Sequence, residues 1–147
     1  MKRRNKAELL ACLLPLIVTL AAGVTMAGDS AITQQDILHH RFVLVSVDGK
    51  DFNAKEPVPS IEFNEGLRIY GAVCNRFRGQ GRLVGNVLTV EQLASTKMLC
   101  ADPDINELEN LLTRMLSEGA ELRLDGQRLM VRQGEHELLY KLSDWVR

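Results

Sequence analysis

The sequence predicts a single α+β domain in which a mainly antiparallel sheet is strongly curved, like a barrel, and one main α-helix packs against it. Three observations support this prediction. The chain has 147 residues, a length typical of one domain. Many short runs of β-branched and apolar residues are separated by glycine-containing turns, which is typical of antiparallel strands. One long segment, residues 102–119, has apolar residues at three- and four-residue spacing, which indicates a helix that covers one face or one end of the sheet.

The N-terminal segment, residues 1–27, is typical of a secretory signal peptide. Four basic residues come first, an uncharged apolar run follows at residues 9–22, and small residues lead up to Ala27. We therefore expect cleavage after Ala27, with Gly23 as the alternative cleavage position, and a mature domain at residues 28–147. The competing interpretation is an uncleaved membrane anchor, because the whole uncharged stretch is close to the minimum length that crosses a bilayer.

The mature domain is expected to be mildly acidic and to contain two cysteines. Removing residues 1–27 takes away four basic residues and Glu8, so the formal net charge changes from −1 to −4. This charge does not favour nucleic-acid binding. The remaining cysteines are Cys74 and Cys100, and an even number in an exported chain favours one disulfide. The alternatives are two buried free thiols, or a redox or metal site, although the pair lacks Cys-x-x-Cys spacing.

The first half of the domain is expected to contain one short helix and several strands. Residues 33–36 resemble a helix-capping sequence, so residues 37–40 are predicted to close a short helix. Residues 53–60 contain two prolines and are predicted to form a loop. The predicted strands are separated by turns at Asp48-Gly49 and Glu65-Gly66, and they cover residues 41–47, 61–63 and 67–73.

The second half contains the strongest helix prediction. Asp102 is a good N-cap, Pro103 suits the first helical position, and Gly119 is a typical helix stop. The apolar face of this helix comprises Ile105, Leu108, Leu112, Met115 and Leu116. The other predicted elements are a hairpin around Gly85-Asn86 at residues 79–84 and 87–90, a sheet extension at residues 92–97, and three strands at residues 121–124, 128–131 and 138–142.

Cys74 and Asn75 form a predicted corner, with Gly71 and Gly79 on either side. Glycine admits backbone angles that other residues avoid, so these two glycines are expected to let the chain turn. Asn75 tolerates the left-handed conformation and is expected to bond its own backbone, and so to fix the corner rather than to contact a substrate. Cys74 and Cys100 are expected to lie on neighbouring parts of one sheet.

Two short motifs resemble the META domain family. The residues that carry the resemblance are Gly71, Cys74, Asn75, Phe77 and Gly79, followed by Thr96, Met98 and Cys100. The resemblance covers about residues 33–144, so the mature chain is expected to be a META-type domain. It implies a small antiparallel barrel-like fold, an envelope location and a link to heat and antibiotic stress. It implies no enzymatic activity, catalytic residue or cofactor. Relatives often carry a lipid-modified cysteine at the end of the signal segment, where this chain has residues 26–29, Met-Ala-Gly-Asp, which favours a periplasmic protein over one associated with the outer membrane.

The sequence offers little support for an enzyme. His39 and His40 are adjacent, and adjacent side chains do not share a helix face, so a metal site is not expected there. His136 would need a nucleophile, for which Cys74 is the one unusual candidate, and oxidation of Cys74 would remove it. We therefore expect a non-enzymatic protein that acts by binding, without metal or cofactor, and keep a Cys74-dependent enzyme as an alternative.

The charges are strongly polarised along the chain. Residues 66–90 contain four arginines and no acid, whereas residues 102–121 have a net charge of −5. In one interpretation the two segments face and partly neutralise each other. In the other, an exposed basic face binds phosphate or carboxylate groups. Its partner would be an anionic envelope component or an unidentified envelope protein, and an assembly module that docks by a sheet edge is the further alternative. The candidate anion-binding residues are Arg76, Arg78, Arg82 and Lys97.

Overall fold

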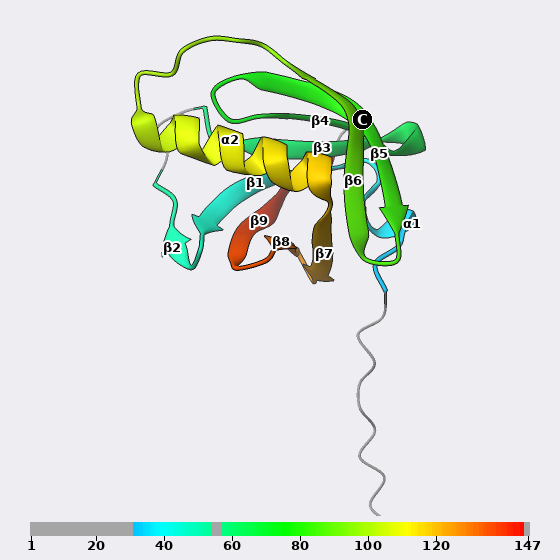
Figure 1. Ribbon diagram of the computed structural model, residues 1–147. Coiled ribbons are helices and arrows are strands. Elements are labelled where there is room, and N and C mark those ends of the chain that lie inside the picture. Colours follow the sequence, from blue (N-terminus) through cyan, green and yellow to red (C-terminus); the bar gives the residue numbers. More distant parts are fainter. Residues whose placement is uncertain (1–30, 54–56, 146–147) are drawn as a thin grey trace, which may run out of the picture.

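The structure, a computed structural model, describes residues 31–53 and 57–145 and shows a closed antiparallel barrel with one main helix (Figure 1). The predicted α+β, barrel-like fold class is confirmed. The predicted signal peptide, residues 1–27, lies outside the described residues. In the part of the chain that the structure describes, no helix is both long enough and apolar enough to cross a membrane.

Eight strands form the barrel, each paired antiparallel with the next around the ring. The last strand pairs with the first, for example through Leu44 and Tyr140, and so closes the ring. A ninth, short strand, β2 (Lys50–Asp51), follows the turn after β1 and pairs antiparallel with the end of β1. In ring order the eight strands are β1 (His40–Val47), β3 (Ser60–Asn64), β4 (Arg68–Ala72), β5 (Arg76–Val84), β6 (Val87–Ser95), β7 (Ala120–Asp125), β8 (Arg128–Gln133) and β9 (His136–Trp145), with a short 3-10 helix, η1 (Glu65–Leu67), between β3 and β4.

The core lies inside this ring because successive side chains of a strand point to opposite faces. Along most strands the buried positions therefore alternate with more exposed ones, and most of the buried residues are apolar. Tyr140 is fully buried among them, and this burial raises the pKa of its hydroxyl. The most completely buried strand residues include Phe42, Ile61, Phe63, Ile69, Leu88, Leu122, Leu129 and Leu138.

The main helix, α2 (Pro103–Glu118), begins and ends where the sequence predicted. The Asp102 side chain accepts a hydrogen bond of 2.9 Å from the Asp104 backbone N–H, which caps the first turn. Gly119 follows the last turn with φ 110°, an angle that residues with a side chain rarely adopt. The buried residues of the helix are Leu108, Leu112, Met115 and Leu116, with Ile105 partly buried beside them.

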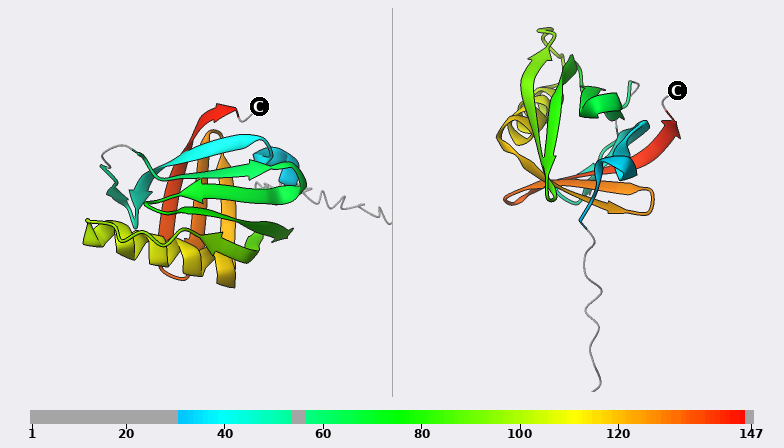
Figure 2. Two further views of the ribbon diagram at one scale, coloured as in Figure 1. Left: turned by 90° about the horizontal axis from the view of Figure 1, so that it is seen from above. Right: turned by 90° about the vertical axis from the view of Figure 1, so that its right-hand side faces the viewer.

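Helix α2 lies beside β6 and β7, which form the shortest strand pairing of the ring. β6 and β7 pair through Val87–Glu121 and Leu88–Ala120. α2 connects these two strands along the chain and packs against β6. Seen end-on, the helix occupies the angle between β6 and the sheet of β7–β9 (Figure 2, right). Its apolar face therefore completes the core where strand pairing stops.

The region around His39 differs from the prediction. The predicted short helix is present as α1 (Gln34–Ile37), with the capping box at Thr33 and Asp36, but it ends at Ile37 rather than at His40. His39 has φ 63°, and His40 already begins β1. The His39 backbone N–H donates to the Phe63 carbonyl oxygen at 2.7 Å. The chain therefore leaves the helix to pair with β3, a segment distant in sequence, and the helix ends earlier than the sequence around it predicts.

The starts of two other strands differ from the predicted ones, because pairing with a neighbouring strand lengthens each of them. β3 begins at Ser60, which the sequence placed in a loop, since Ser60 pairs with Ala72 of β4. β5 begins at Arg76 rather than Gly79, since Arg76 also pairs with Ala72. β2 was not predicted.

Candidate functional site

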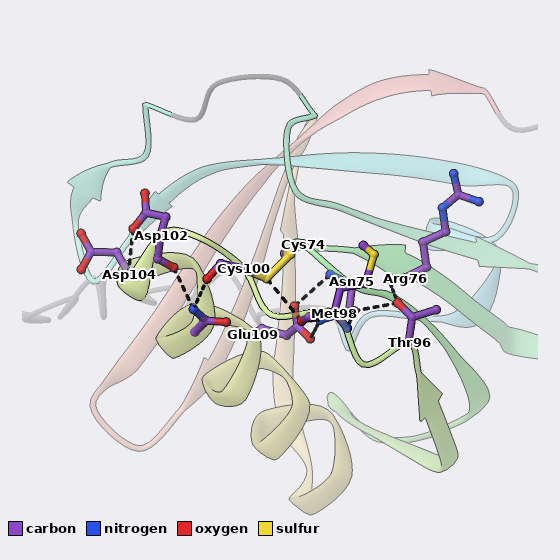
Figure 3. Close-up of a disulfide and its surroundings, with 10 residues drawn as sticks. Cys74, Asn75, Arg76, Thr96, Met98, Cys100, Asp102, Asp104 and Glu109 are labelled. Atoms are coloured by element: carbon purple, nitrogen blue, oxygen red, sulfur yellow. Dashed lines mark hydrogen bonds between the residues drawn. A yellow bond between two sulfur atoms is a disulfide. The ribbon is translucent and has the colours of Figure 1, made fainter.

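The predicted corner is closed by a disulfide between Cys74 and Cys100 (Figure 3). Their Cα atoms are 6.2 Å apart, within the usual range for a disulfide. The expectation that they lie on neighbouring parts of one sheet is wrong. Cys74 occupies the bend between β4 and β5, and Cys100 belongs to the loop that precedes α2. The disulfide therefore ties a turn of the barrel to the segment that starts the helix.

The Asn75 side chain, which is 5% exposed, holds the loop after β6 against this corner. Its Nδ2 donates to the Met98 carbonyl oxygen at 3.0 Å and to Glu109 Oε1 at 2.8 Å. Its Oδ1 accepts from Thr96 Oγ1 at 2.8 Å and from the Met98 backbone N–H at 2.7 Å. Both donor hydrogens and both acceptor positions of the amide are thus used. We call these four residues the Asn75 network.

Asn75 fixes the corner by a different mechanism from the predicted one. It is not among the residues with a left-handed backbone, and its side chain bonds distant segments rather than its own backbone. The most distant partner is Glu109, which is 34 positions away in sequence. The corner is therefore stabilised by tertiary hydrogen bonds, which no local sequence pattern reveals.

Glu109 is the residue of this network that sequence reasoning missed. Its Oε2 also accepts from the Asn75 backbone N–H at 2.9 Å, so one carboxylate satisfies two donors of the same residue. A sequence signal was available: Glu109 falls at helical spacing between Ile105 and Leu112, on the apolar side of α2. An acid on that side of a helix is expected to have a buried partner.

Gly71 and Gly79 do not turn the chain, which corrects the predicted reason for them. Both lie inside strands. A Cβ on Gly71 would lie 2.3 Å from Phe77 Cζ and 2.5 Å from the Ser60 carbonyl oxygen, and one on Gly79 would lie 2.4 Å from Val90 Cγ1. These glycines are required because neighbouring atoms occupy the space of a side chain. Phe77, the aromatic residue of the motif, is the ring that fills the space above Gly71.

Replacing Gly71 by alanine is expected to lower the free energy of unfolding by about 1–3 kcal/mol, the usual effect of overpacking a core. The clash involves the Ser60 backbone as well as the Phe77 ring, so a change of rotamer does not relieve it fully. Urea unfolding followed by circular dichroism measures the loss. The Gly71→Ala/Phe77→Leu double variant should recover part of it, and a single variant as stable as the parent would contradict the packing argument.

Arg76, Arg78 and Arg82 project from one face of β5, because they alternate with inward-facing residues. The three side chains are exposed but not equivalent. Arg82 Nε lies 3.3 Å from Glu91 Oε1, whereas Arg76 and Arg78 have no ion-pair partner among the described residues. Within the same residues, no β5 arginine pairs with an acid of α2, so the suggested neutralisation by the helix is not seen as ion pairs. Lys97 is also exposed, in the loop after β6.

Tyr70 is the aromatic residue of this surface, and the sequence analysis did not select it. It lies opposite Arg78 in the β4–β5 ladder and is 37% exposed. Thr96 connects the surface to the Asn75 network, since its Oγ1 also accepts from the Arg76 backbone N–H at 3.1 Å. We call Tyr70, Arg76, Arg78 and Thr96 the arginine face. A hollow of about 460 Å³ lies on it, lined by Tyr70, Arg76, Phe77, Arg78, Ala94, Ser95 and Thr96.

The histidine and cysteine of the enzyme alternative are engaged in other contacts. His136 Nδ1 lies 3.0 Å from Asp48 Oδ2. The pKa of Asp48 is lowered, first by the hydrogen bond from the Glu137 backbone N–H and then by the one with His136. The sulfur of Cys74 is bonded to Cys100, so it carries no thiolate in this form of the protein.

One grouping with the spacing of metal ligands occurs in the described part of the chain. Its potential ligand atoms belong to Cys74, Cys100 and Glu109 and lie within 4.8 Å of one another. The two sulfurs are bonded to each other, and the Glu109 carboxylate accepts both of its hydrogen bonds from Asn75. The grouping serves to hold the corner together.

A closed antiparallel barrel, one covering helix and a disulfide-fixed corner define a small barrel domain whose candidate site is an open surface. The sequence model of the META domain matches residues 35–145, and the chain belongs to this family.

Known relatives agree with this assignment. "Heat shock protein HslJ" of Escherichia coli (strain K12) is 42% identical over 125 residues, which cover 85% of this chain and 89% of that protein. An NMR structure of a protein with 43% identity has a TM-score of 0.71 and covers 76% of this chain and 95% of its own. A second NMR structure, of a protein from Burkholderia xenovorans, has a TM-score of 0.61 at 16% identity over 97% and 99% of the two chains, a likeness of fold alone.

Proposed function

We propose that this chain is exported to the periplasm and acts there in the response to heat and antibiotic stress, by binding an anionic envelope component rather than by catalysis. The heat-stress assignment follows the similarity to the protein named "Heat shock protein HslJ". The location is supported by the N-terminal sequence and by the disulfide, since disulfides persist in oxidising compartments.

The observation that carries the binding role is the pair Arg76 and Arg78 on the arginine face. Both are exposed, and neither forms an ion pair with another described residue. They border a hollow that is also lined by Tyr70 and Thr96. Guanidinium groups bind phosphate and carboxylate in a fork geometry, and an aromatic ring beside them adds an apolar contact. The Thr96 hydroxyl donates its proton to Asn75, so it holds the face in place rather than contacting the anion. An anionic headgroup or acidic saccharide fits this surface.

The arrangement favours binding over chemistry. In the Asn75 network, which fixes the arginine face, every hydrogen-bonding group of the Asn75 side chain is already used. Cys74, the neighbouring cysteine, is oxidised in the disulfide. The four predicted anion-binding residues are not equal in this proposal. Arg76 and Arg78 contact the anion, Lys97 lies at the border of the face, and Arg82 contributes least because Glu91 already pairs with it.

Replacing Arg76 and Arg78 together by glutamine is expected to weaken retention on an immobilised sulfated polysaccharide at low salt at least about tenfold, because each basic side chain near an anionic surface contributes about 1 kcal/mol. The retention of the parent protein should fall as salt rises, since exposed charges are screened. Elution by a salt gradient measures both effects.

The matched control is the Arg82→Gln/Arg132→Gln variant. It removes the same charge, but from arginines that pair with Glu91 and Glu137. It should elute close to the parent. Equal losses in the two double variants would show a response to net charge alone. A parent protein that binds neither this matrix nor vesicles of anionic lipid would overturn the proposed function.

A further inference from the structure

The loop between β6 and α2 exposes two large apolar side chains next to each other. Met98 is 62% exposed and Leu99 is 93% exposed. Apolar residues scattered singly on a surface are ordinary. An adjacent pair at the border of a charged face is less ordinary, because it adds an apolar tip to a surface that already presents arginines.

This loop is held in a fixed conformation. Both backbone polar groups of Met98 are bonded to the Asn75 side chain, and the Thr96 backbone N–H donates to the Arg76 carbonyl oxygen at 3.0 Å. One residue after Leu99, the chain is anchored by the Cys100 sulfur. The fixed backbone therefore keeps the two apolar side chains exposed. A surface that is ordered before binding loses less conformational entropy when it binds.

The surroundings of the apolar pair are basic on one side. Lys97 precedes it, and Thr96 and Arg76, both part of the arginine face, come next. The nearest acids along the chain are Asp102 and Asp104, which lie on the other side of the disulfide from Arg76 and Thr96 (Figure 3). The tip and its basic border can thus approach an anionic surface without bringing these carboxylates to it.

We propose that Met98 and Leu99 insert into an anionic lipid bilayer while Arg76, Arg78 and Lys97 contact its headgroups. This inference rests on the proposed function and names the ligand of the arginine face as a membrane surface. Apolar side chains that enter the interface together with flanking basic residues that attract anionic lipid are the two elements of peripheral membrane binding. A stable protein interface buries about 800 Å² on each partner around an apolar centre, whereas the large apolar side chains that this loop exposes are two, Met98 and Leu99.

The test measures co-sedimentation with vesicles of pure phosphatidylglycerol and of pure phosphatidylcholine. The parent should bind the anionic vesicles and not the neutral ones. Leu99→Ser and Met98→Ser should each reduce binding to the anionic vesicles roughly tenfold, the factor expected when one buried apolar side chain is lost. The Met98 change keeps the backbone hydrogen bonds to Asn75. Val84→Ser is the matched control, because Val84 is also 62% exposed but lies beside the hairpin turn at the opposite end of β6.

A second measurement reports insertion directly. In Leu99→Trp, tryptophan emission should shift to shorter wavelength on addition of anionic vesicles and should be quenched by brominated lipid, more than in the parent. Retention on the sulfated polysaccharide should be unchanged in both serine variants, because they keep the arginines.

The outcomes separate the two proposals. Salt-sensitive retention of the parent together with full vesicle binding by Leu99→Ser would leave the arginine face as an anion site and overturn insertion. Another outcome concerns chemical cross-linking in envelope extract. If the parent cross-links to an envelope protein and Leu99→Ser does not, while vesicle binding is intact, the loop binds a protein partner and membrane insertion is overturned. A parent protein that binds neither probe would overturn the proposed function itself.

Discussion

Opening the Cys74–Cys100 disulfide is expected to lower the free energy of unfolding by about 3–4 kcal/mol, because the bridge closes a loop of roughly 27 residues and restricts the unfolded chain. A domain of this size has a total stability of about 5–15 kcal/mol, so the loss is a large share of it. The Cys74→Ser/Cys100→Ser variant should therefore show a clearly lower urea midpoint. The variant should still fold, since the Asn75 network holds the same loop by hydrogen bonds.

The state of the native cysteines is measured on protein from the osmotic-shock fraction. Its mass should correspond to a chain that begins near Gly28, and the denatured sample should contain no titratable thiol. Two free thiols in that material would show that the Cys74–Cys100 disulfide does not form in the exported protein. A chain that retains Met1 would favour the alternative of an anchored N-terminal segment.

The elements that the sequence predicted best depend on local signals. Helix α2 has its cap at Asp102, its stop at Gly119 and an apolar face between them, so its limits follow from neighbouring residues. The hairpin turns at Gly85, Gly126 and Gly134 likewise have positive φ, as glycine turns require. The candidate anion-binding arginines were selected from the distribution of charge along the chain, and Arg76, Arg78 and Arg82 are exposed on β5.

The features that the sequence did not predict depend on contacts between distant segments. His39 leaves the helix because its N–H is bonded by β3, and Gly71 is required because the Phe77 ring lies above it. The ion pair of Arg82 with Glu91 depends on the cross-strand register around an irregularity in the β5–β6 ladder. Each of these facts needs the fold to be known first, whereas the residue types alone gave the position of the corner.

Asn75 is expected to be the most sensitive single position of the corner. In Asn75→Ala, the Met98 backbone groups and Glu109 Oε1 lose their partners, while Glu109 Oε2 keeps the backbone N–H of residue 75. Each buried group left unsatisfied costs about 1–3 kcal/mol. Because water reaches part of this loop, we expect a total loss of about 3–5 kcal/mol. Urea unfolding measures it. Asn110→Ala, on the exposed surface of α2, is the matched control and should change stability by less than about 0.5 kcal/mol.

Asn75→Asp separates the hydrogen bonds from the volume of the side chain. Aspartate keeps the acceptor for Thr96 and Met98 but places a carboxylate against that of Glu109, so at neutral pH this variant should be at least as unstable as Asn75→Ala. The like charges raise the pKa of the new carboxyl pair in the folded state, so protonation favours folding and the stability lost at neutral pH should return as the pH falls. Adding Glu109→Gln should restore part of it at neutral pH, because the glutamine amide can donate to the aspartate. If the two changes were simply additive, Asn75 and Glu109 would not be coupled, and the hydrogen bonds between them would not stabilise the corner.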